Sequence, residues 1–113
     1  MRVLDGERLL CRIYFGDSDQ WHHQPLSRAL LERLRREGFA GATMFHGVAG
    51  FGAASVIHTA HLVELSSDLP VLIEVVEDEE HAERLVAILD EMLTGGALVT
   101  MEKVRVLKYA SGH

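Results

Sequence analysis

The chain has 113 residues, of which 48% are hydrophobic and 25% charged, and its net charge at pH 7 is −6. This length favours a single domain, residues 1–113, and the acidic balance argues against a general binder of nucleic acid or of an anionic membrane surface, since an acidic protein surface repels phosphate. A single cysteine excludes an internal disulfide, and the sequence shows neither a signal-peptide pattern nor an apolar run of transmembrane length, so we expect a cytoplasmic protein without membrane insertion.

The first half of the chain is predicted to form a strand, a loop, a helix and a second strand. Residues 8–15 alternate between apolar and polar side chains, as in a half-buried strand, whereas residues 16–24 are mostly polar and read as a loop. Pro25 suits the first position of a helix, in which leucines recur at helical spacing until Gly38 ends it. Residues 41–52 then alternate like a strand and run into a glycine-bearing loop.

The second half is predicted to form a strand, a helix and a last strand, after a segment without a clear period. Residues 53–68 could hold a strand or a helical turn, and the choice stays open. Residues 69–76 form a strand that has a proline near its start, Asp78 is a good N-cap, and the glycines at 95–96 stop the following helix. Residues 98–109 form the last strand. The helix is expected to bury a stripe made of Ala82, Leu85, Ile88, Leu89 and Met92.

This order of elements is typical of an α+β protein with the ferredoxin-like βαββαβ arrangement, a four-stranded antiparallel sheet with two helices on one face. The strands are apolar on both sides, so the second face of the sheet also needs a cover. Another subunit supplies that cover more readily than residues 53–68 folded back over the face. The interface face is predicted to consist of Val71, Ile73, Val75, Val104 and Val106.

Few residues suggest catalysis, and the sequence predicts a protein that is not an enzyme. Cys11 alternates with apolar neighbours, as a buried small hydrophobe does, and no nucleophile-elbow motif occurs. Glu74 is a lone carboxylate on a core strand, where an interface hydrogen bond is the more ordinary role. His58 and His61 have the i, i+3 spacing that lets two imidazoles share a metal ion, although a histidine pair alone is a weak metal signature.

Several separated motifs resemble those of PII signalling proteins. Gly41-Ala-Thr followed by Gly50-Phe-Gly is similar to the second strand and loop of PII, and residues 69–76 are similar to its Leu-Pro strand. Leu93-Thr-Gly-Gly resembles the start of the second ligand loop of PII. With Ser55-Val-Ile-His-Thr-Ala added, the pattern is identified as that of a small PII-like family, domain of unknown function 190, over nearly the whole chain.

This resemblance implies a regulatory protein that assembles as a homotrimer and binds a small effector, often an adenine nucleotide, in clefts between subunits. Residues 53–68 would form a loop presented to a target protein. Backbone N–H groups of the glycine loops would cradle an anion, and a side chain at Gly52 would block that approach and disfavour a positive φ. Carried over by position, the ligand-binding residues are Thr43, Gly50, Phe51, Gly52, Gly95, Gly96 and Lys108.

The charges of the predicted cleft differ from those of PII. Where PII has basic residues that hold a polyphosphate, this chain has Val71 and Val106, while Lys108 occupies one of the basic positions. A nucleoside monophosphate or a less charged adenine ligand therefore suits the cleft better than ATP. Two other hypotheses stay open: a protein that binds divalent metal through His58 and His61, as the fold shared with CutA proteins implies, and a structural trimer without a ligand.

Overall fold

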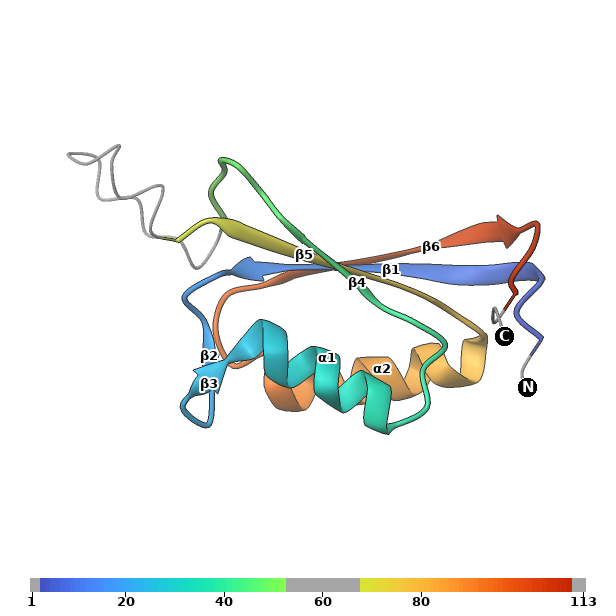
Figure 1. The fold of residues 1–113 in the computed structure, drawn as a ribbon, viewed down its shortest axis with the longest axis horizontal. Helices are drawn as coiled ribbons and strands as arrows, with labels where there is room; N and C mark the ends of the chain where they lie inside the picture. Colours follow the sequence, from blue (N-terminus) through green and yellow to red (C-terminus); the bar gives the residue numbers. More distant parts are fainter. Residues whose placement is uncertain (1–2, 53–67, 111–113) are drawn as a thin grey trace.

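The structure, a computed structural model, describes residues 3–52 and 68–110 (Figure 1). A four-stranded sheet and two helices form its main body, and a two-stranded hairpin lies between the first long strand and the first helix. Neither described helix is long and apolar enough to cross a membrane. In chain order the elements are β1 (Gly6–Gly16), β2 (Gln20–Trp21), β3 (Gln24–Pro25), α1 (Leu26–Arg36), β4 (Thr43–His46), β5 (Pro70–Glu77), α2 (Glu79–Met92) and β6 (Leu98–Val106).

The sheet has the strand order β4-β5-β1-β6, and every neighbouring pair is antiparallel. The central strand is β1, in which Cys11 lies opposite Val75 of β5 and opposite Met101 of β6. Both helices cover the same face of the sheet (Figure 1). This is the ferredoxin-like arrangement, so the predicted fold class is confirmed. Of the segment whose structure the sequence left open, residues 53–68, all but Asp68 lie outside the described residues, His58 and His61 included.

Local capping sets the boundaries of both helices. α2 begins after Asp78, as predicted, because the Asp78 carboxylate accepts the backbone N–H of His81 at 2.8 Å. α1 ends at Arg36, and Gly38 follows with a φ of 83°, the left-handed conformation of a C′ glycine. Pro25 lies one position ahead of the prediction, because it is the N-cap of α1 rather than its first residue.

Residues 16–24, predicted to be a loop, contain part of a small hairpin. β2 and β3 pair so that His22 and His23 form the two-residue turn between them. Both histidines have a positive φ, 47° and 67°, as a type I′ turn requires. The Trp21 ring stacks on the His22 ring with centroids 4.2 Å apart. Histidines replace the usual Asn-Gly signature of such a turn, which is why the sequence analysis did not find the hairpin.

The core lies between the helices and one face of the sheet, the covered face. Ile13, Val71 and Ile73 on this face are 0% exposed, and Leu30 and Leu34 of α1 are equally buried. Burial of each such aliphatic side chain stabilises the fold by roughly 1.5–3 kcal/mol before entropy is counted. The apolar stripe predicted for α2 is confirmed, since Ala82, Leu85, Ile88, Leu89 and Met92 are all buried.

The residues predicted to form one interface face belong to two different faces. Directly opposite residues of an antiparallel ladder share a face: Val75 lies opposite Cys11, whereas Val104 lies opposite Arg8. The prediction was wrong because β5 is apolar on both sides, so that its alternation does not tell which side the helices cover. The core residues of that set are Val71, Ile73 and Val75, and the residues on the other side are Val104 and Val106.

The second face of the sheet, the open face, has no described helix over it (Figure 1). At its centre, Arg12 forms ion pairs with Glu74 at 3.1 Å and with Glu102 at 2.8 Å. Apolar side chains flank this charged row on both sides, toward either end of the strands. By register, the open face consists of Thr43 and Phe45 of β4, Leu72, Glu74 and Val76 of β5, Arg8, Leu10, Arg12 and Tyr14 of β1, and Leu98, Thr100, Glu102, Val104 and Val106 of β6.

Candidate functional site

The predicted ligand residues are distributed along both edges of the sheet. On the β4 edge, Thr43 begins the strand opposite Glu74, and residues 50–52 follow the end of the strand. On the β6 edge, residues 95–96 precede the strand and Lys108 follows it. The two edges are three strand spacings apart, about 14 Å, and the nine residues of β6 span about 30 Å. One chain therefore does not bring all the predicted residues into one site.

Gly50 is the glycine of this loop whose conformation excludes a side chain. Its φ is 155°, and a Cβ built there would lie 3.0 Å from Cγ of Pro70. Gly52 differs, because its φ is not in the positive range and a Cβ built there meets nothing within 4 Å. The expectation of a positive φ at Gly52 is therefore wrong, and Gly50 meets it instead. Phe51, between them, is 78% exposed.

A polar cluster that the sequence analysis missed lies where β4 ends and β5 begins. His46 Nε2 lies 2.8 Å from Asp17 Oδ1, which joins the end of β4 to the turn after β1. Ser18 donates its backbone N–H and its hydroxyl to Asp68 Oδ1, at 3.1 and 2.8 Å. Gly16 lies so close that a Cβ there would come within 2.5 Å of Asp68 Oδ1. The members come from three distant parts of the chain, so no motif spacing could have revealed them.

The charge at this end of the sheet is predominantly negative. Asp17, Asp19 and Asp68 are near one another along the same turn and strand end, with His46 as their neighbouring base. Burial raises the pKa of Asp19, the backbone N–H of Gly16 opposes that rise, and the charge of Asp68 adds to it. Such carboxylates repel a highly charged anion, so the surroundings favour a ligand with few phosphate charges.

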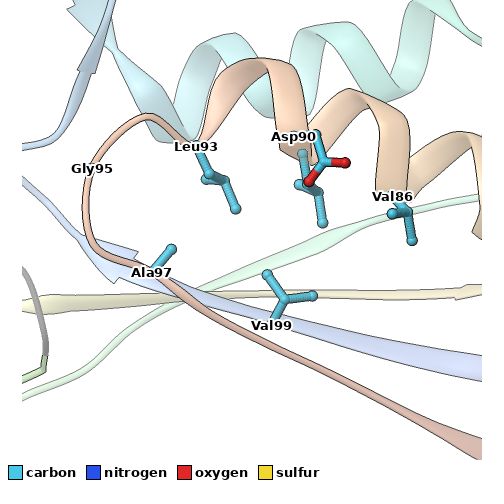
Figure 2. Close-up of a pocket in the computed structure, with 7 residues that line it drawn as sticks. Val86, Asp90, Leu93, Gly95, Ala97 and Val99 are labelled. Atoms are coloured by element: carbon cyan, nitrogen blue, oxygen red, sulfur yellow. The ribbon is translucent and has the colours of Figure 1, made fainter.

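A hollow of 270 Å³ lies between the second half of α2 and the start of β6 (Figure 2). Its walls are mostly apolar, and Asp90 is the carboxylate among them. Gly95 is the predicted ligand residue that lines it. The volume is below the range of about 300–1,000 Å³ that is usual for small-molecule sites, so the hollow of one chain is small for a ligand the size of a nucleotide. The full lining is Val86, Leu89, Asp90, Leu93, Gly95, Ala97 and Val99.

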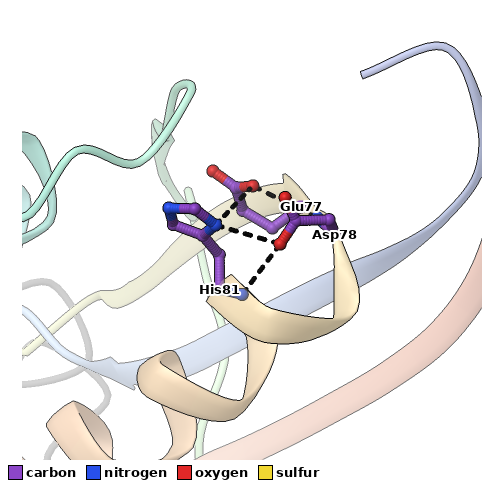
Figure 3. A group of neighbouring side chains, drawn as sticks. All are labelled: Glu77, Asp78 and His81. Carbon is purple, nitrogen blue, oxygen red and sulfur yellow. Dashed lines mark hydrogen bonds and ion pairs between the residues drawn. The ribbon is translucent and has the colours of Figure 1, made fainter. Parts of the chain in front are cut away.

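Three potential metal ligands gather at the start of α2 (Figure 3). Donor atoms of Glu77, Asp78 and His81 lie within 4.8 Å of one another, and carboxylate with imidazole is a donor set that zinc accepts. These groups already serve the fold, because Asp78 caps the N–H of His81 at 2.8 Å and Glu77 accepts the N–H of Ala40 at 2.6 Å. The positive end of the helix also opposes a cation. The arrangement therefore fits a structural role better than a metal centre.

The two other residues considered for chemistry have structural surroundings. Cys11 is 2% exposed, and burial raises its pKa to about 11, so that its thiol stays protonated and weakly nucleophilic at neutral pH. Glu74, expected to make an interface hydrogen bond, accepts one from Arg12 within the same chain. Neither side chain is prepared for nucleophilic or general-base work in this state.

The sequence matches one protein-family model and several relatives over most of its length. Residues 8–106 match the model of the family DUF190, described as Uncharacterized ACR, COG1993. A UPF0166 protein of Aquifex aeolicus is 34% identical over 107 residues, which cover 95% of this chain and 98% of that protein. The UPF0166 protein MJ1524 of Methanocaldococcus jannaschii is 30% identical over 99 residues, 88% of this chain and 91% of that protein.

A solved structure supports the fold independently. The crystal structure of a Thermus thermophilus protein, provisionally named a PII-like signaling protein, superimposes with a TM-score of 0.63. The match covers 90% of this chain and 91% of the other, at 21% sequence identity. At that identity the likeness establishes the fold and leaves the ligand to be argued from the residues.

Proposed function

Because the chain belongs to the DUF190 family and has a PII-like fold, we propose that it is a regulatory protein that assembles as a homotrimer and binds an adenine nucleotide between its subunits. The observation that carries this proposal is the open face of the sheet. Phe45 and Leu98 on that face are 47% and 58% exposed, and they lie among partly buried apolar neighbours. Exposed apolar side chains on one face of a sheet, here on both sides of the Arg12 ion pairs, support burial of that face against another chain, and the resemblance to PII proteins supports three copies.

The positions of the predicted ligand residues support a cleft between subunits. Residues 50–52 belong to the β4 edge, whereas residues 95–96 belong to the β6 edge, where the apolar hollow is open. If the β4 edge of one copy approaches the β6 edge of the next, both glycine segments contribute to one enclosed site. Backbone N–H groups of such segments suit a phosphate, and the apolar wall suits a base.

The charges favour AMP over ATP as the ligand. Asp90 lines the hollow, and Asp17 and Asp68 lie near the end of β4. Lys108, the predicted basic residue, would have to come from another copy to reach either glycine segment, since it lies beyond the opposite end of β6. A single lysine compensates one or two phosphate charges and not four. We further propose that residues 53–68 present the regulatory signal to a target protein.

The assembly is tested by light scattering on the purified chain. A trimer has three times the 12.6 kDa mass of one chain. A stable monomer at micromolar concentration would overturn the trimer and, with it, a site between subunits.

The ligand is tested by calorimetric titration with AMP, ADP and ATP. We expect AMP to bind more tightly than ATP, and Gly50→Val to abolish binding because the positive φ strains any side chain there and a Cβ would lie only 3.0 Å from Pro70 Cγ. Gly52→Val is the comparison within the same loop, since a Cβ there meets none of the described residues within 4 Å and its φ is not positive, so it should weaken binding less than Gly50→Val does. Loss of binding in Gly52→Val with retention in Gly50→Val would overturn the site assignment.

A double variant, His58→Ala with His61→Ala, tests the metal hypothesis and should keep nucleotide binding. If it instead removed stoichiometric zinc binding, the metal hypothesis would replace the nucleotide one.

A further inference from the structure

The connection between α1 and β4 is held by residues that no motif pointed to. We propose that Glu77 and Tyr109 are positioning residues, which fix the backbone of residues 41–43 so that the start of β4 can receive the ligand. This inference rests on the proposed function, because Thr43 is one of the predicted ligand residues. Its physical basis is the hydrogen bonding of Ala40, whose two backbone polar groups are both held by side chains from other parts of the chain.

Glu77 holds the N–H side of Ala40. It is the last residue of β5, 1% exposed, and its Oε2 accepts the N–H of Ala40 at 2.6 Å while its Oε1 accepts the N–H of Asp78 at 3.2 Å. A buried carboxylate is costly unless it is hydrogen-bonded, and an apolar residue at this point of the covered face would pack without that cost. Besides its 3.9 Å contact with His81 Nδ1, the carboxylate holds backbone N–H groups, and the one outside its own helix cap is that of Ala40.

Tyr109 holds the carbonyl side of Ala40. Its hydroxyl donates to the Ala40 carbonyl oxygen at 3.2 Å, and its own backbone N–H donates to the Asp5 carboxylate at 2.8 Å. The segment after β6 is thereby tied both to the residue before β1 and to the start of the β4 segment. Lys108 precedes Tyr109 directly, so the same two hydrogen bonds set the course of a predicted ligand residue.

Of the residues that follow Ala40, Ala42 packs against the core, whereas Gly41 is exposed. A Cβ built on Gly41 meets nothing within 4 Å, so packing does not limit the backbone at that position. The ring of His81 stands edge-on to Phe39 with centroids 5.4 Å apart, which steadies the residue before Ala40. The path from Ala40 to Thr43 is therefore fixed by the hydrogen bonds of Ala40 at one end, by the packing of Ala42 against the core, and by the pairing of Thr43 with Glu74 at the other end.

The test uses the full-length chain and two readouts, one with ligand and one without. The first readout is the amide hydrogen exchange of Gly41 and Ala42 by NMR, and the second is the affinity for AMP by calorimetry. Tyr109→Phe removes one hydroxyl from a side chain that is 37% exposed and lies outside the core. The variant should therefore fold. We expect it to accelerate exchange at residues 41 and 42 by about tenfold and to weaken AMP binding by a similar factor, the usual consequence of one lost hydrogen bond.

Substitutions at Glu77 separate positioning from simple stabilisation. Glu77→Gln keeps an oxygen that accepts the Ala40 N–H, so it should restore most of the affinity that Glu77→Ala loses. Glu80→Gln, an exposed glutamate in the first turn of α2, is the matched control for charge and should change neither readout.

Unchanged exchange and unchanged affinity in folded Tyr109→Phe would overturn the proposal, as would a fall in melting temperature with affinity unaltered. If the native chain binds no nucleotide, the proposed function fails. The exchange measurement still decides the positioning role, because exchange at Gly41 as slow in Tyr109→Phe as in the native chain would refute it.

Discussion

The two faces of the sheet differ in how far their side chains are shielded from water. On the covered face, the helices shield apolar residues such as Ile13, Ile73 and Val75, each at most 1% exposed. On the open face, apolar residues such as Val76 are partly buried, and the ion pairs of Arg12 lie among them. The comparison shows that one face is complete within a single chain. The other leaves apolar side chains exposed around a central row of paired charges, and the proposed assembly would cover it.

The same contrast appears in two arginines, each of which bridges two carboxylates. Arg12 on the open face pairs with one glutamate of β5 and one of β6. Arg33 on the outer side of the helices pairs with Glu37 and with Glu91 of α2. Exposed pairs of this type contribute little to stability, whereas a pair buried by assembly cannot lose one partner without leaving a desolvated charge. Replacing each arginine in turn therefore tests whether the surface around it stays in contact with water in the assembled protein.

The largest effect should come from adjacent valines on opposite faces. Val75→Asp places a charge among the core residues, so the chain should unfold, as circular dichroism would show. Val76→Asp places the same charge on the open face, so the chain should stay folded and lose its assembly, as light scattering would show. A folded Val75→Asp variant, or a Val76→Asp variant that keeps the native mass, would contradict the division into a covered and an interface face.

The next effect concerns the charged row of the open face. Arg12→Met removes the partner of Glu74 and Glu102, and both carboxylates would then be desolvated without compensation in the assembly. We expect subunit association to weaken by at least about a hundredfold, while the monomer unfolds at nearly the native denaturant concentration. Sedimentation at graded concentrations measures the first quantity. An unchanged dissociation constant would mean that the row remains in water.

The order of elements was predictable because each element carries a strong local signal. Asp78 and Gly38 are helix-end residues with a clear chemical role, and the stripe of α2 follows the helical period. The face that each strand presents was less predictable. Ile73 and Val76 are both apolar, and only the long-range pairing of β5 with β1 decides which of them meets the helices.

The candidate site was less predictable than the fold, because its parts are linked through space. The positive φ expected in the glycine loop is present at Gly50, where Pro70 also excludes a side chain, and is absent at Gly52. The Asp17–His46 pair and the hydrogen bond from Tyr109 to Ala40 join residues 29 and 69 positions apart. No spacing rule addresses such pairs, whereas the glycine motif could be read directly from the sequence.

A smaller effect is expected in thiol reactivity, compared between Cys11 on the covered face and a cysteine introduced on the open face. Burial raises the pKa of Cys11 to about 11, against an ordinary value near 9.0, so the native thiol should resist a thiol reagent at pH 8 until the chain unfolds. The unfolded thiol loses its proton first, so the free energy of unfolding should fall as pH rises from 9 toward 11. Leu10→Cys places a thiol on the open face as the comparison. It should react quickly in a dissociated chain and slowly in the assembly; rapid reaction of Cys11 in the folded protein would contradict its burial.

The smallest effect belongs to the arginine on the outer side of the helices. The hydrogen bonds from Arg33 lower the pKa of Glu37 and of Glu91 below their ordinary value near 4.5. Both carboxylates therefore contribute stability that is present above pH 4.5 and is lost as pH falls through their lowered native pKa values, because the unfolded chain takes up protons first. Arg33→Met should make the free energy of unfolding less dependent on pH below pH 4.5. It should leave the mass of the assembly unchanged. The Glu91 side chain is 52% exposed and those of Arg33 and Glu37 are 22% and 27% exposed, so solvent screens these pairs in part, and the change should be modest and should shrink further in high salt. If Arg33→Met dissociated the protein as Arg12→Met is expected to, the outer side of the helices would also be an interface, and the contrast between the two arginines would fail.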